Sequence, residues 1–268
     1  MLFYMVGKDK LNTVNILGVP LYASNISSAT QIILNNCNSD KRSNYCVSAT
    51  GAHGLVFAKR NKEFGMVLKS FFMNLPDGMP GVWVGRMKGG NEMRRCYGPD
   101  FFASVLTHSD NLFVTHFFCG GNQGVAEELK DTVKIKFKNN NVVGTFCPPY
   151  QDVDKYDYET IAKQINQTKA NIVWIGLSTP KQELFARNLA LRTNVNFIIT
   201  VGAAFDFHTD KVRQAPAFIQ KIGMEWFFRL VMEPKRLYKR YLEIVPLFIY
   251  YNAVELIKFA VQKSYSSK

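Results

Sequence analysis

One aspartate stands alone in the stretch FFMNLPDGMPGVW. Asp77 lies between Pro76 and Gly78, with no basic residue beside it. Pro-Asp-Gly is typical of a tight turn, in which the carboxylate accepts hydrogen bonds from nearby backbone N–H groups. A carboxylate in apolar surroundings is also a candidate general base, because such surroundings raise its pKa. This stretch by itself leaves both roles open.

Two other segments could bind a phosphate or another anion. CGGNQG precedes a helical pattern, so Gly120 and Gly121 would let backbone N–H groups approach a phosphate at a helix N-terminus. The segment lacks the spacing of a dinucleotide fingerprint, and the same glycines could form only a tight turn. LSTPKQE places Pro180 in the first turn of another helix and offers Lys181 and Gln182 to a polar anionic ligand. An ordinary Ser or Thr cap is the alternative for LSTPKQE.

Two acidic segments complete the set of candidate sites. Asp206 lies between Phe205 and Phe207, where it could bind substrate, cap a helix or pair with a basic residue. QDVDKYD contains Asp152 and Asp154 at a spacing by which paired carboxylates can hold a divalent metal. That segment reads as a polar loop rather than the end of an apolar strand. Because the four histidines also show no ligand spacing, we expect no metal site and no cofactor.

The elements that must position these residues alternate along the chain. Short apolar runs (NYCVSAT, NLFVTHFFCGG, NVVGTFCPP, NIVWIGL and NFIITVGAAF) are separated by amphipathic stretches such as NQGVAEELKDTVKIKF, YETIAKQINQT and PKQELFARNLALR. This alternation predicts an α/β fold, with a mostly parallel Rossmann-like sheet flanked by helices. Ligands bind such sheets at the carboxyl ends of the strands, so function is expected in the strand-to-helix loops.

The pattern changes near residue 210, so we predict an α/β domain over residues 1–210 and a helical appendage over residues 211–268. The helical pattern of the appendage is interrupted at Pro234 and Pro246. Its run IVPLFIYY is too short to span a membrane and contains Pro246. We therefore expect the appendage to lie on a membrane without crossing it.

Basic and aromatic residues are mixed in the appendage. Such a mixture suits the headgroup layer of an anionic bilayer or a nucleic acid backbone, whereas the alternative is a solvated basic face on a core-packed helix. The basic residues near one face at helical spacing are Arg229, Arg236 and Arg240, with Lys235 and Lys239 beside them.

Composition limits the class of protein. The 268 residues are 47% hydrophobic, enough for a sizeable core, and the net charge of +12 favours an anionic partner such as a nucleic acid, an acidic membrane or a phosphorylated substrate. Five cysteines without a C-x-x-C pair argue against disulfides and zinc. The N-terminus is apolar for only six residues, fewer than a signal peptide needs. We therefore expect a protein of the reducing cytosol.

Six motifs in order resemble the WecG/TagA/CpsF glycosyltransferase family of bacteria. They are NLPDGMPGVWVGR, RRCYGPDFF, GGNQGVAEEL, GLSTPKQE, VGAAFDF and APAFIQKIGMEWFFRLVMEPKRLYKRYL, and they cover the chain from about Val14 to Leu242. The resemblance implies the GT-E type of Rossmann-like fold. It also implies transfer of a sugar from a UDP-sugar to a polyprenyl-diphosphate-linked saccharide at the inner leaflet, with inversion and without a metal.

The resemblance assigns roles to particular residues. Asp77 corresponds to the proposed general base of the family, which would take the proton of the acceptor hydroxyl. By motif position the polar substrate-binding residues are Thr50, Arg95 and Gln182, and the appendage residues that would complete the site at the membrane are Arg229, Arg236 and Arg240. Many relatives have asparagine two residues after the motif threonine, where this chain has Ala52 followed by His53.

Two other classes of function compete with a glycosyltransferase. The net charge permits a nucleic-acid-binding α/β protein, but no recognised RNA or DNA motif supports one, so we expect no nucleic acid partner. A catalytically silent membrane scaffold would be marked by loss of Asp77, which is present. The expected partners are a UDP-sugar donor, a lipid-diphosphate-linked saccharide acceptor and an anionic membrane surface, and the oligomeric state stays open.

Overall fold

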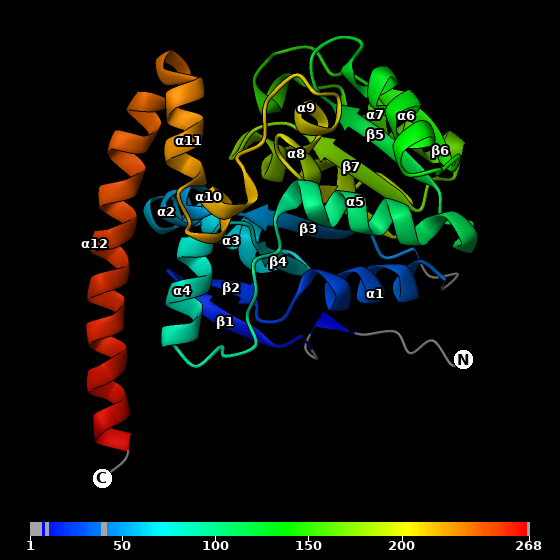
Figure 1. Cartoon of the computed structure of the whole chain (residues 1–268). Coiled ribbons are helices and arrows are strands. Elements are labelled where there is room, and N and C mark those ends of the chain that lie inside the picture. The colour runs from blue at the N-terminus through cyan, green and yellow to red at the C-terminus, as the bar shows by residue number, and fades with distance from the viewer. Residues whose placement is uncertain (1–6, 9–10, 39–41, 267–268) are drawn as a thin grey trace.

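The structure is a computed structural model that describes residues 7–8, 11–38 and 42–266, so the residues 1–6 weighed against a signal peptide lie outside it. Its centre is a six-stranded sheet in the order β4-β3-β8-β7-β5-β6 (Figure 1). Each neighbouring pair of strands is parallel, which confirms the predicted fold class. The strands are β3 (Tyr45–Thr50), β4 (Met73–Pro76), β5 (His116–Gly120), β6 (Val142–Phe146), β7 (Ile172–Gly176) and β8 (Phe197–Thr200).

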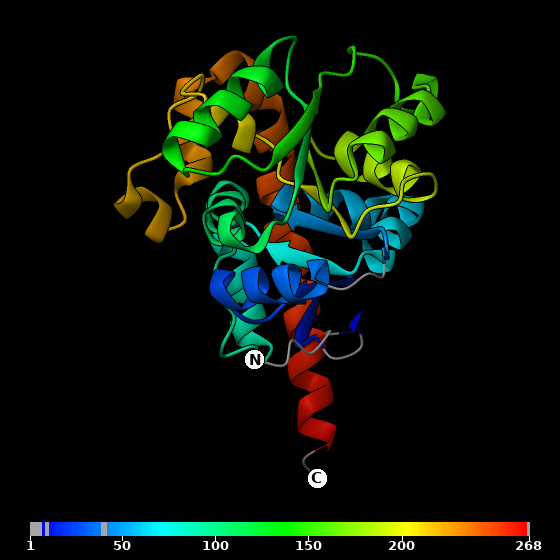
Figure 2. The same ribbon diagram turned by 90° about the vertical axis from the view of Figure 1, so that its right-hand side faces the viewer.

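Helices cover both faces of this sheet (Figures 1 and 2). One apolar cluster, which contains Trp174 and Phe102, joins the sheet to α1 (Ile26–Cys37), α5 (Gly98–Ser109) and α6 (Val125–Lys136). A second cluster joins the opposite face to α2 (Ala52–Arg60), α3 (Lys62–Ser70), α7 (Tyr158–Thr168) and α8 (Lys181–Ala190). Because the sheet is buried on both faces, its strands read as almost continuous apolar runs in the sequence.

Short elements that the apolar runs do not reveal support the first part of the sheet. β1 (Thr13–Ile16) and β2 (Val19–Tyr22) form an antiparallel hairpin whose turn residues, Leu17 and Gly18, have φ of 53° and 88°. β4 contains Asn74 and ends at Pro76, and α4 (Met79–Met87) follows it directly. The turn between β4 and α4 contains Asp77, so this short strand is the element that places the candidate base.

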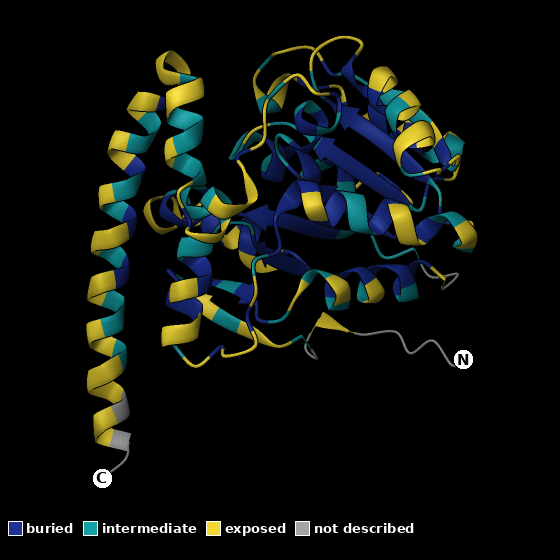
Figure 3. Ribbon diagram, in the orientation of Figure 1, coloured by how far each residue is buried: buried dark blue, intermediate teal, exposed yellow. Residues whose placement is uncertain are grey.

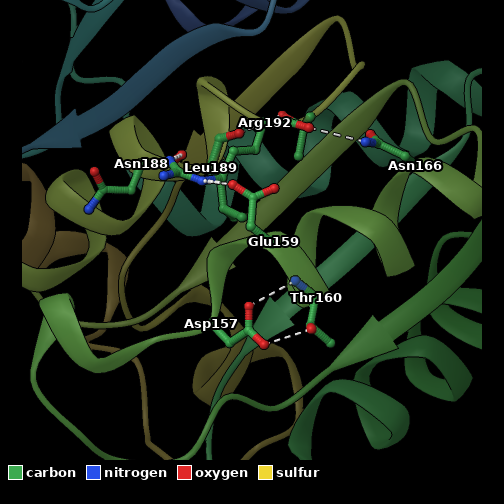
Figure 4. A network of polar contacts seen from close by, with 8 residues as sticks. Asp157, Glu159, Thr160, Asn166, Asn188, Leu189 and Arg192 are labelled. Carbon is green, nitrogen blue, oxygen red and sulfur yellow. Dashed lines mark hydrogen bonds and ion pairs between the residues drawn. The ribbon is translucent and has the colours of Figure 1, made fainter.

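Polar contacts fix the helices α7 and α8 on the outer surface (Figure 4). Asp157 caps α7, because its carboxylate accepts hydrogen bonds from the N–H and the hydroxyl of Thr160, at 3.0 and 2.7 Å. Arg192, just after α8, donates to the Glu159 carboxylate at 2.7 Å, and Asn166 donates to the Arg192 carbonyl at 3.1 Å. These contacts connect two helices of the same layer.

Four further helices follow β8. They are α9 (Ala204–His208), α10 (Ala217–Lys221), α11 (Glu225–Met232) and α12 (Pro234–Ser266). α11 packs on α12, and α12 packs on α2 through Ile244 and Phe248. The predicted boundary near residue 210 falls between α9 and α10, and the division into two domains stays a prediction.

The two appendage prolines have different effects. Pro234 begins α12 and separates it from α11, as predicted, but Pro246 lies inside α12 without ending it. The predicted interruption at Pro246 was therefore wrong. Proline leaves the carbonyl four residues earlier without a donor, and here that residue, Leu242, is 72% exposed, so water can take the place of the missing N–H. Apolar contacts of Ile244 and Phe248 hold the helix on both sides of the proline.

One face of α12 lies against the rest of the molecule and the other is exposed (Figure 3). Within the described residues, Pro234–Gln262 is a helix long and apolar enough to cross a membrane by length and composition, so the apolar segment is longer than the run IVPLFIYY alone indicated. That the appendage lies on a membrane without crossing it stays a prediction. The same helix carries Glu255, whose carboxylate accepts a hydrogen bond from the Leu17 N–H at 2.9 Å and pairs with Lys88 at 2.6 Å. These contacts tie the distal half of α12 to the β1–β2 hairpin and α4.

Candidate active site

Asp77 lies at the carboxyl edge of the sheet, directly after β4. Its Oδ1 accepts a hydrogen bond from the N–H of Gly98 at 2.8 Å, and its own N–H donates to the Thr50 carbonyl at 3.3 Å. The carboxylate therefore caps the start of α5 across the site rather than its own turn. Burial raises the pKa of Asp77 from 3.8 to about 6, although the Gly98 N–H and the charge of Arg95 act in the opposite direction.

The second carboxylate oxygen of Asp77 faces the loop after β3. A Cβ built on Gly51 would lie 3.6 Å from Oδ2, an ordinary van der Waals distance, so this loop lies directly beside the carboxylate. The Gly98 N–H bonds Oδ1 and leaves Oδ2 as the atom able to accept a proton from a ligand. The carboxylate thus binds a backbone N–H 21 residues away instead of one in its own turn, and this geometry is compatible with the catalytic role, which stays a prediction.

Thr50 and Gln182 lie close to the same edge but are buried. Thr50 Oγ1 donates to Ser48 Oγ at 3.0 Å. Gln182 is 1% exposed, its Nε2 donates to Glu183 Oε1 at 2.9 Å, and its Oε1 accepts from the Gly202 N–H at 3.0 Å. The Gln182 amide is thus occupied by the protein itself and holds the loop after β8 against α8.

A buried carboxylate connects these two predicted substrate residues. Glu183 Oε1 also accepts hydrogen bonds from Ser48 at 3.2 Å and from Thr179 at 2.9 Å. Burial raises the pKa of Glu183, while these donors and Gln182 lower it. The alternative of an ordinary Ser or Thr cap at α8 is wrong, because Thr179 bonds Glu183 and no side chain caps the helix.

Gly120 and Gly121 are needed by the backbone of the β5 loop. They have φ of 145° and 74°, and a Cβ on Gly120 would lie 2.6 Å from the carbonyl oxygen of Gly176 on β7. A Cβ on Gly121 would lie 2.7 Å from Val125. The tight-turn alternative accounts for both glycines, and their contact with a phosphate stays a prediction.

Arg95 reaches from the loop before α5 to the predicted base and to the appendage. Its Nε donates to the Asp77 carbonyl at 2.8 Å, and Nη1 donates to Gln220 Oε1 at 2.7 Å. Nη2 forms an ion pair with Glu225, and the guanidinium lies 4.0 Å from the ring centre of Tyr97. Sequence patterns did not single out Gln220 or Glu225, although both lie within a motif of the family resemblance.

The three predicted appendage arginines lie on two helices but gather in one region. The charges of Arg229 and Arg236 both act on Arg240, whose pKa burial lowers. Arg229 acts on Asp77, and its Nε is buried without a hydrogen-bond partner in the described part of the chain. Arg236 pairs with Glu233 at 2.5 Å. Of the three, Arg229 is the arginine whose charge reaches the predicted base.

Asp206 lies inside α9, half-buried, rather than at a helix cap. Burial raises its pKa, and the charge of Arg236 lowers it. This setting favours the alternative of a carboxylate facing basic residues. Asp152 and Asp154 lie at a short helical turn, η3 (Val153–Lys155), where the Asp152 carboxylate pairs with Lys155 at 2.8 Å.

His53, one of the departures from the family pattern, lies in the first turn of α2. It lines a groove of about 450 Å³ between α2 and α12, together with Arg60 and Glu243, which form an ion pair across it. Burial and the charge of Arg240 lower the pKa of His53 to about 4, so the imidazole is neutral at pH 7. The departure therefore adds no charge to the site.

A parallel α/β sheet with a carboxylate at its carboxyl edge and arginines facing it is suited to an enzyme that acts on an anionic substrate. The family model described as Glycosyl transferase WecG/TagA/CpsF family matches residues 14–262, and the chain belongs to that family. The resemblance seen in the six motifs is thereby confirmed, and the chain is a glycosyltransferase.

Two similar proteins come from bacilli, and both carry the name N-acetylglucosaminyldiphosphoundecaprenol N-acetyl-beta-D-mannosaminyltransferase. The protein of Bacillus subtilis (strain 168) is 26% identical over 234 residues, which is 87% of this chain and 89% of the relative. The protein of Bacillus spizizenii (strain ATCC 23059 / NRRL B-14472 / W23) is 29% identical over 187 residues, which is 70% of each. By their names, these relatives act on a lipid-diphosphate-linked N-acetylglucosamine.

Proposed function

We propose that this protein transfers a sugar from a UDP-sugar to a polyprenyl-diphosphate-linked saccharide in bacterial surface polysaccharide synthesis, with inversion and without a metal. The observation that carries the proposal is Asp77. Its carboxylate has a raised pKa, one oxygen fixed by Gly98 and the other free to accept a proton, at the edge where parallel sheets bind ligands. The names of the two relatives support the lipid-linked acceptor.

The proposed reaction is a single displacement. Asp77 Oδ2 takes the proton of the acceptor hydroxyl while the oxygen of that hydroxyl attacks the anomeric carbon of the donor. The bond from that carbon to the β-phosphate oxygen breaks, and UDP leaves with the electron pair. Attack from the face opposite the leaving group inverts the anomeric centre.

Positive charge from the protein would stabilise the departing diphosphate. Arg229 is placed for this role, since its charge acts on Asp77 and its buried Nε has a donor to spare among the described residues. Arg236 and Arg240 extend the same cationic region. Fixed cations are worth more in a partly desolvated site than in water, so they can take the place of a metal ion.

The appendage would bring the enzyme to its lipid-linked acceptor at the inner face of the membrane. Large apolar side chains on α10, α11 and α12 and at the end of α10 are exposed, among them Phe218, Ile222, Phe227, Val231 and Leu242. Lys235 and Lys239 are exposed beside them. Apolar side chains next to lysines suit the interface of an anionic bilayer.

A donor panel tests the proposed function. The protein is incubated with several UDP-sugars, UDP-N-acetylmannosamine among them, and a short-chain lipid diphosphate carrying N-acetylglucosamine. Transfer from one UDP-sugar, with release of UDP and a β-linked product from an α-linked donor, is the expected result. In parallel, UDP should raise the melting temperature. No transfer from any donor, together with no thermal shift by UDP, would contradict the proposal.

A further inference from the structure

Arg95 is the junction between the predicted base and the appendage. Three of its nitrogens are used: Nε by the Asp77 carbonyl, Nη1 by Gln220 and Nη2 by Glu225. The face of the guanidinium lies 4.0 Å from the ring centre of Tyr97. A guanidinium held at three nitrogens and one face has little rotamer freedom, so its position depends on both appendage residues.

Gln220 is itself oriented for this contact. Its Nε2 donates to the Ala215 carbonyl at 2.7 Å, which leaves Oε1 to accept from Arg95 at 2.7 Å. Gln220 lies in α10, where no residue is fully buried. The amide is therefore fixed by polar contacts rather than by apolar packing.

Glu225 forms the charged half of the contact. It lies in the first turn of α11, and the side chains of Arg95 and Glu225 are each only 14% exposed. Removing one partner of an ion pair shielded from water to this extent is destabilising, because the other charge is left unpaired. The contact is thus strong enough to determine where α11 sits relative to Asp77.

We propose that Glu225 and Gln220 are positioning residues for sugar transfer: they hold the guanidinium of Arg95, which fixes the backbone of Asp77. The inference rests on the proposed function and extends it to residues that touch neither substrate. Its consequence is that the general base is correctly placed only while α10 and α11 are docked. Catalysis is thereby coupled to the segment proposed to contact the membrane.

The charges around Asp77 determine the direction in which its pKa should move when the contact with the appendage is changed. Facing the carboxylate are the cations Arg95 and Arg229 and the anion Glu225, with the un-ionised Cys96 and Tyr97 nearby. Glu225 raises the pKa of Asp77, whereas both arginines lower it. Removing the charge of Glu225 should therefore lower the pKa of Asp77 and move the acid limb of the pH–rate profile to lower pH.

The test uses Glu225→Gln and Gln220→Met in the full-length protein, which keep the side-chain sizes. Each should lower kcat by roughly 10- to 100-fold, the scale expected when a catalytic group is displaced by about 1 Å. The KM for the donor should change by less than about threefold, because neither residue touches it. Glu225→Asp, which restores the charge, should recover part of kcat. The acid limb should move to lower pH in Glu225→Gln and stay in place in Gln220→Met.

Glu243→Gln is the matched control. Like Glu225→Gln, it removes an ion pair between the appendage and the α/β part of the chain, here the pair of Glu243 with Arg60. It does not touch Arg95. Its kcat and pH profile should equal those of the wild type. Melting temperatures of all variants show whether lost activity reflects lost folding.

Three outcomes would overturn the inference. The first is an unchanged kcat in Glu225→Gln, and the second is a kcat that falls to the same extent in Glu243→Gln. The third is a faster Glu225→Gln, which would mean that Glu225 withholds Arg95 from the substrate rather than positioning it.

Titration of the Asp77 carboxyl by ¹³C NMR measures its pKa in each variant without any need for enzyme activity. If the wild type transferred no sugar but Glu225→Gln still lowered the pKa of Asp77, the proposed function would fail and the coupling would be supported.

Discussion

The carboxyl edge of the sheet and the helices α10 and α11 hold their polar residues in different ways. At the edge, Thr50, Gln182 and Glu183 are buried and bond one another or the backbone. In α10 and α11 no residue is fully buried, and large apolar side chains face outward. The edge is positioned by the interior of the protein, whereas α10 and α11 depend on a few polar contacts.

This difference suggests a division of tasks within one site. In the proposed mechanism the buried edge supplies Asp77 and the loops around it, whose polar contacts lie mostly within the α/β part of the chain. The appendage supplies the arginines, and its contacts with Arg95 and with α2 hold it against the α/β part of the chain. Changes at the edge should therefore affect chemistry directly, whereas changes in the appendage should affect chemistry through Arg95 and the appendage arginines, or affect membrane contact alone.

The largest effect is expected for Asp77→Asn. The amide can still accept the Gly98 N–H through its oxygen but cannot take a proton, so turnover should fall by roughly 10²- to 10⁴-fold. UDP should raise the melting temperature of the variant as it does that of the wild type. A variant that kept more than about half of the wild-type turnover would remove Asp77 from the mechanism.

A smaller loss is expected for Arg229→Ala. Removing a charged donor to the diphosphate should lower kcat/KM for the donor by roughly 10- to 100-fold. Arg213→Ala removes an exposed charge between α9 and α10 and is the matched control, for which we expect no loss. Equal losses in the two variants would show that net charge, and not the position of Arg229, is what matters.

Outward-facing lysines should affect membrane binding alone. Lys235→Glu with Lys239→Glu should weaken binding to vesicles with anionic lipids by roughly 30-fold or more, since each lysine contributes on the order of 1 kcal/mol. Transfer to a water-soluble acceptor analogue should be unchanged. Vesicle flotation at two salt concentrations measures the first effect, and loss of the soluble reaction would show that the lysines face the site.

The raised pKa of Asp77 predicts how stability varies with pH. Between pH 3.8 and about 6 the folded protein binds a proton at Asp77 that the unfolded chain releases, so stability falls as pH rises through this window. Above pH 6 the buried charge lowers stability in the wild type but not in Asp77→Asn. The variant should melt higher at pH 8 and equally near pH 4, measured by calorimetry. A difference independent of pH would contradict a raised pKa.

The smallest effect is expected from removing metal ions. Excess EDTA should leave turnover unchanged, because the proposed cations are arginines, and Asp154→Ala should be mild. The Asp152 carboxylate is already paired with Lys155. Loss of activity with chelator, restored by Mg²⁺ or Mn²⁺, would show that a metal ion, and not the arginines alone, stabilises the leaving diphosphate.

Periodicity predicted the five strands that read as apolar runs, because a sheet buried on both faces leaves little room for polar residues. It did not reveal β4, where Asn74 and Pro76 interrupt the run, although that strand carries Asp77. It also wrongly ended the helix at Pro246, since proline breaks a helix only when no solvent or packing compensates.

The residues that connect the candidate site were harder to find from the sequence than the candidate base, Asp77. The resemblance pointed to Asp77, Arg95 and Gln182, which lie in distinctive motifs. Glu225 pairs with a residue 130 positions away, and Glu183 bonds Ser48 across 135 positions. Such contacts depend on the tertiary fold and leave no local pattern, so only the motif positions of the two glutamates could have drawn attention to them.

The contacts of Glu255 favour a position of α12 at the membrane surface over a position across the bilayer. To cross a bilayer, α12 would have to give up the Leu17 N–H and Lys88 and carry a carboxylate into hydrocarbon, at a cost of roughly 3 kcal/mol by insertion scales. Lying along the interface keeps both contacts. In the proposed function such a helix binds the surface reversibly, which would let one enzyme molecule visit many patches of membrane in search of lipid-linked acceptors.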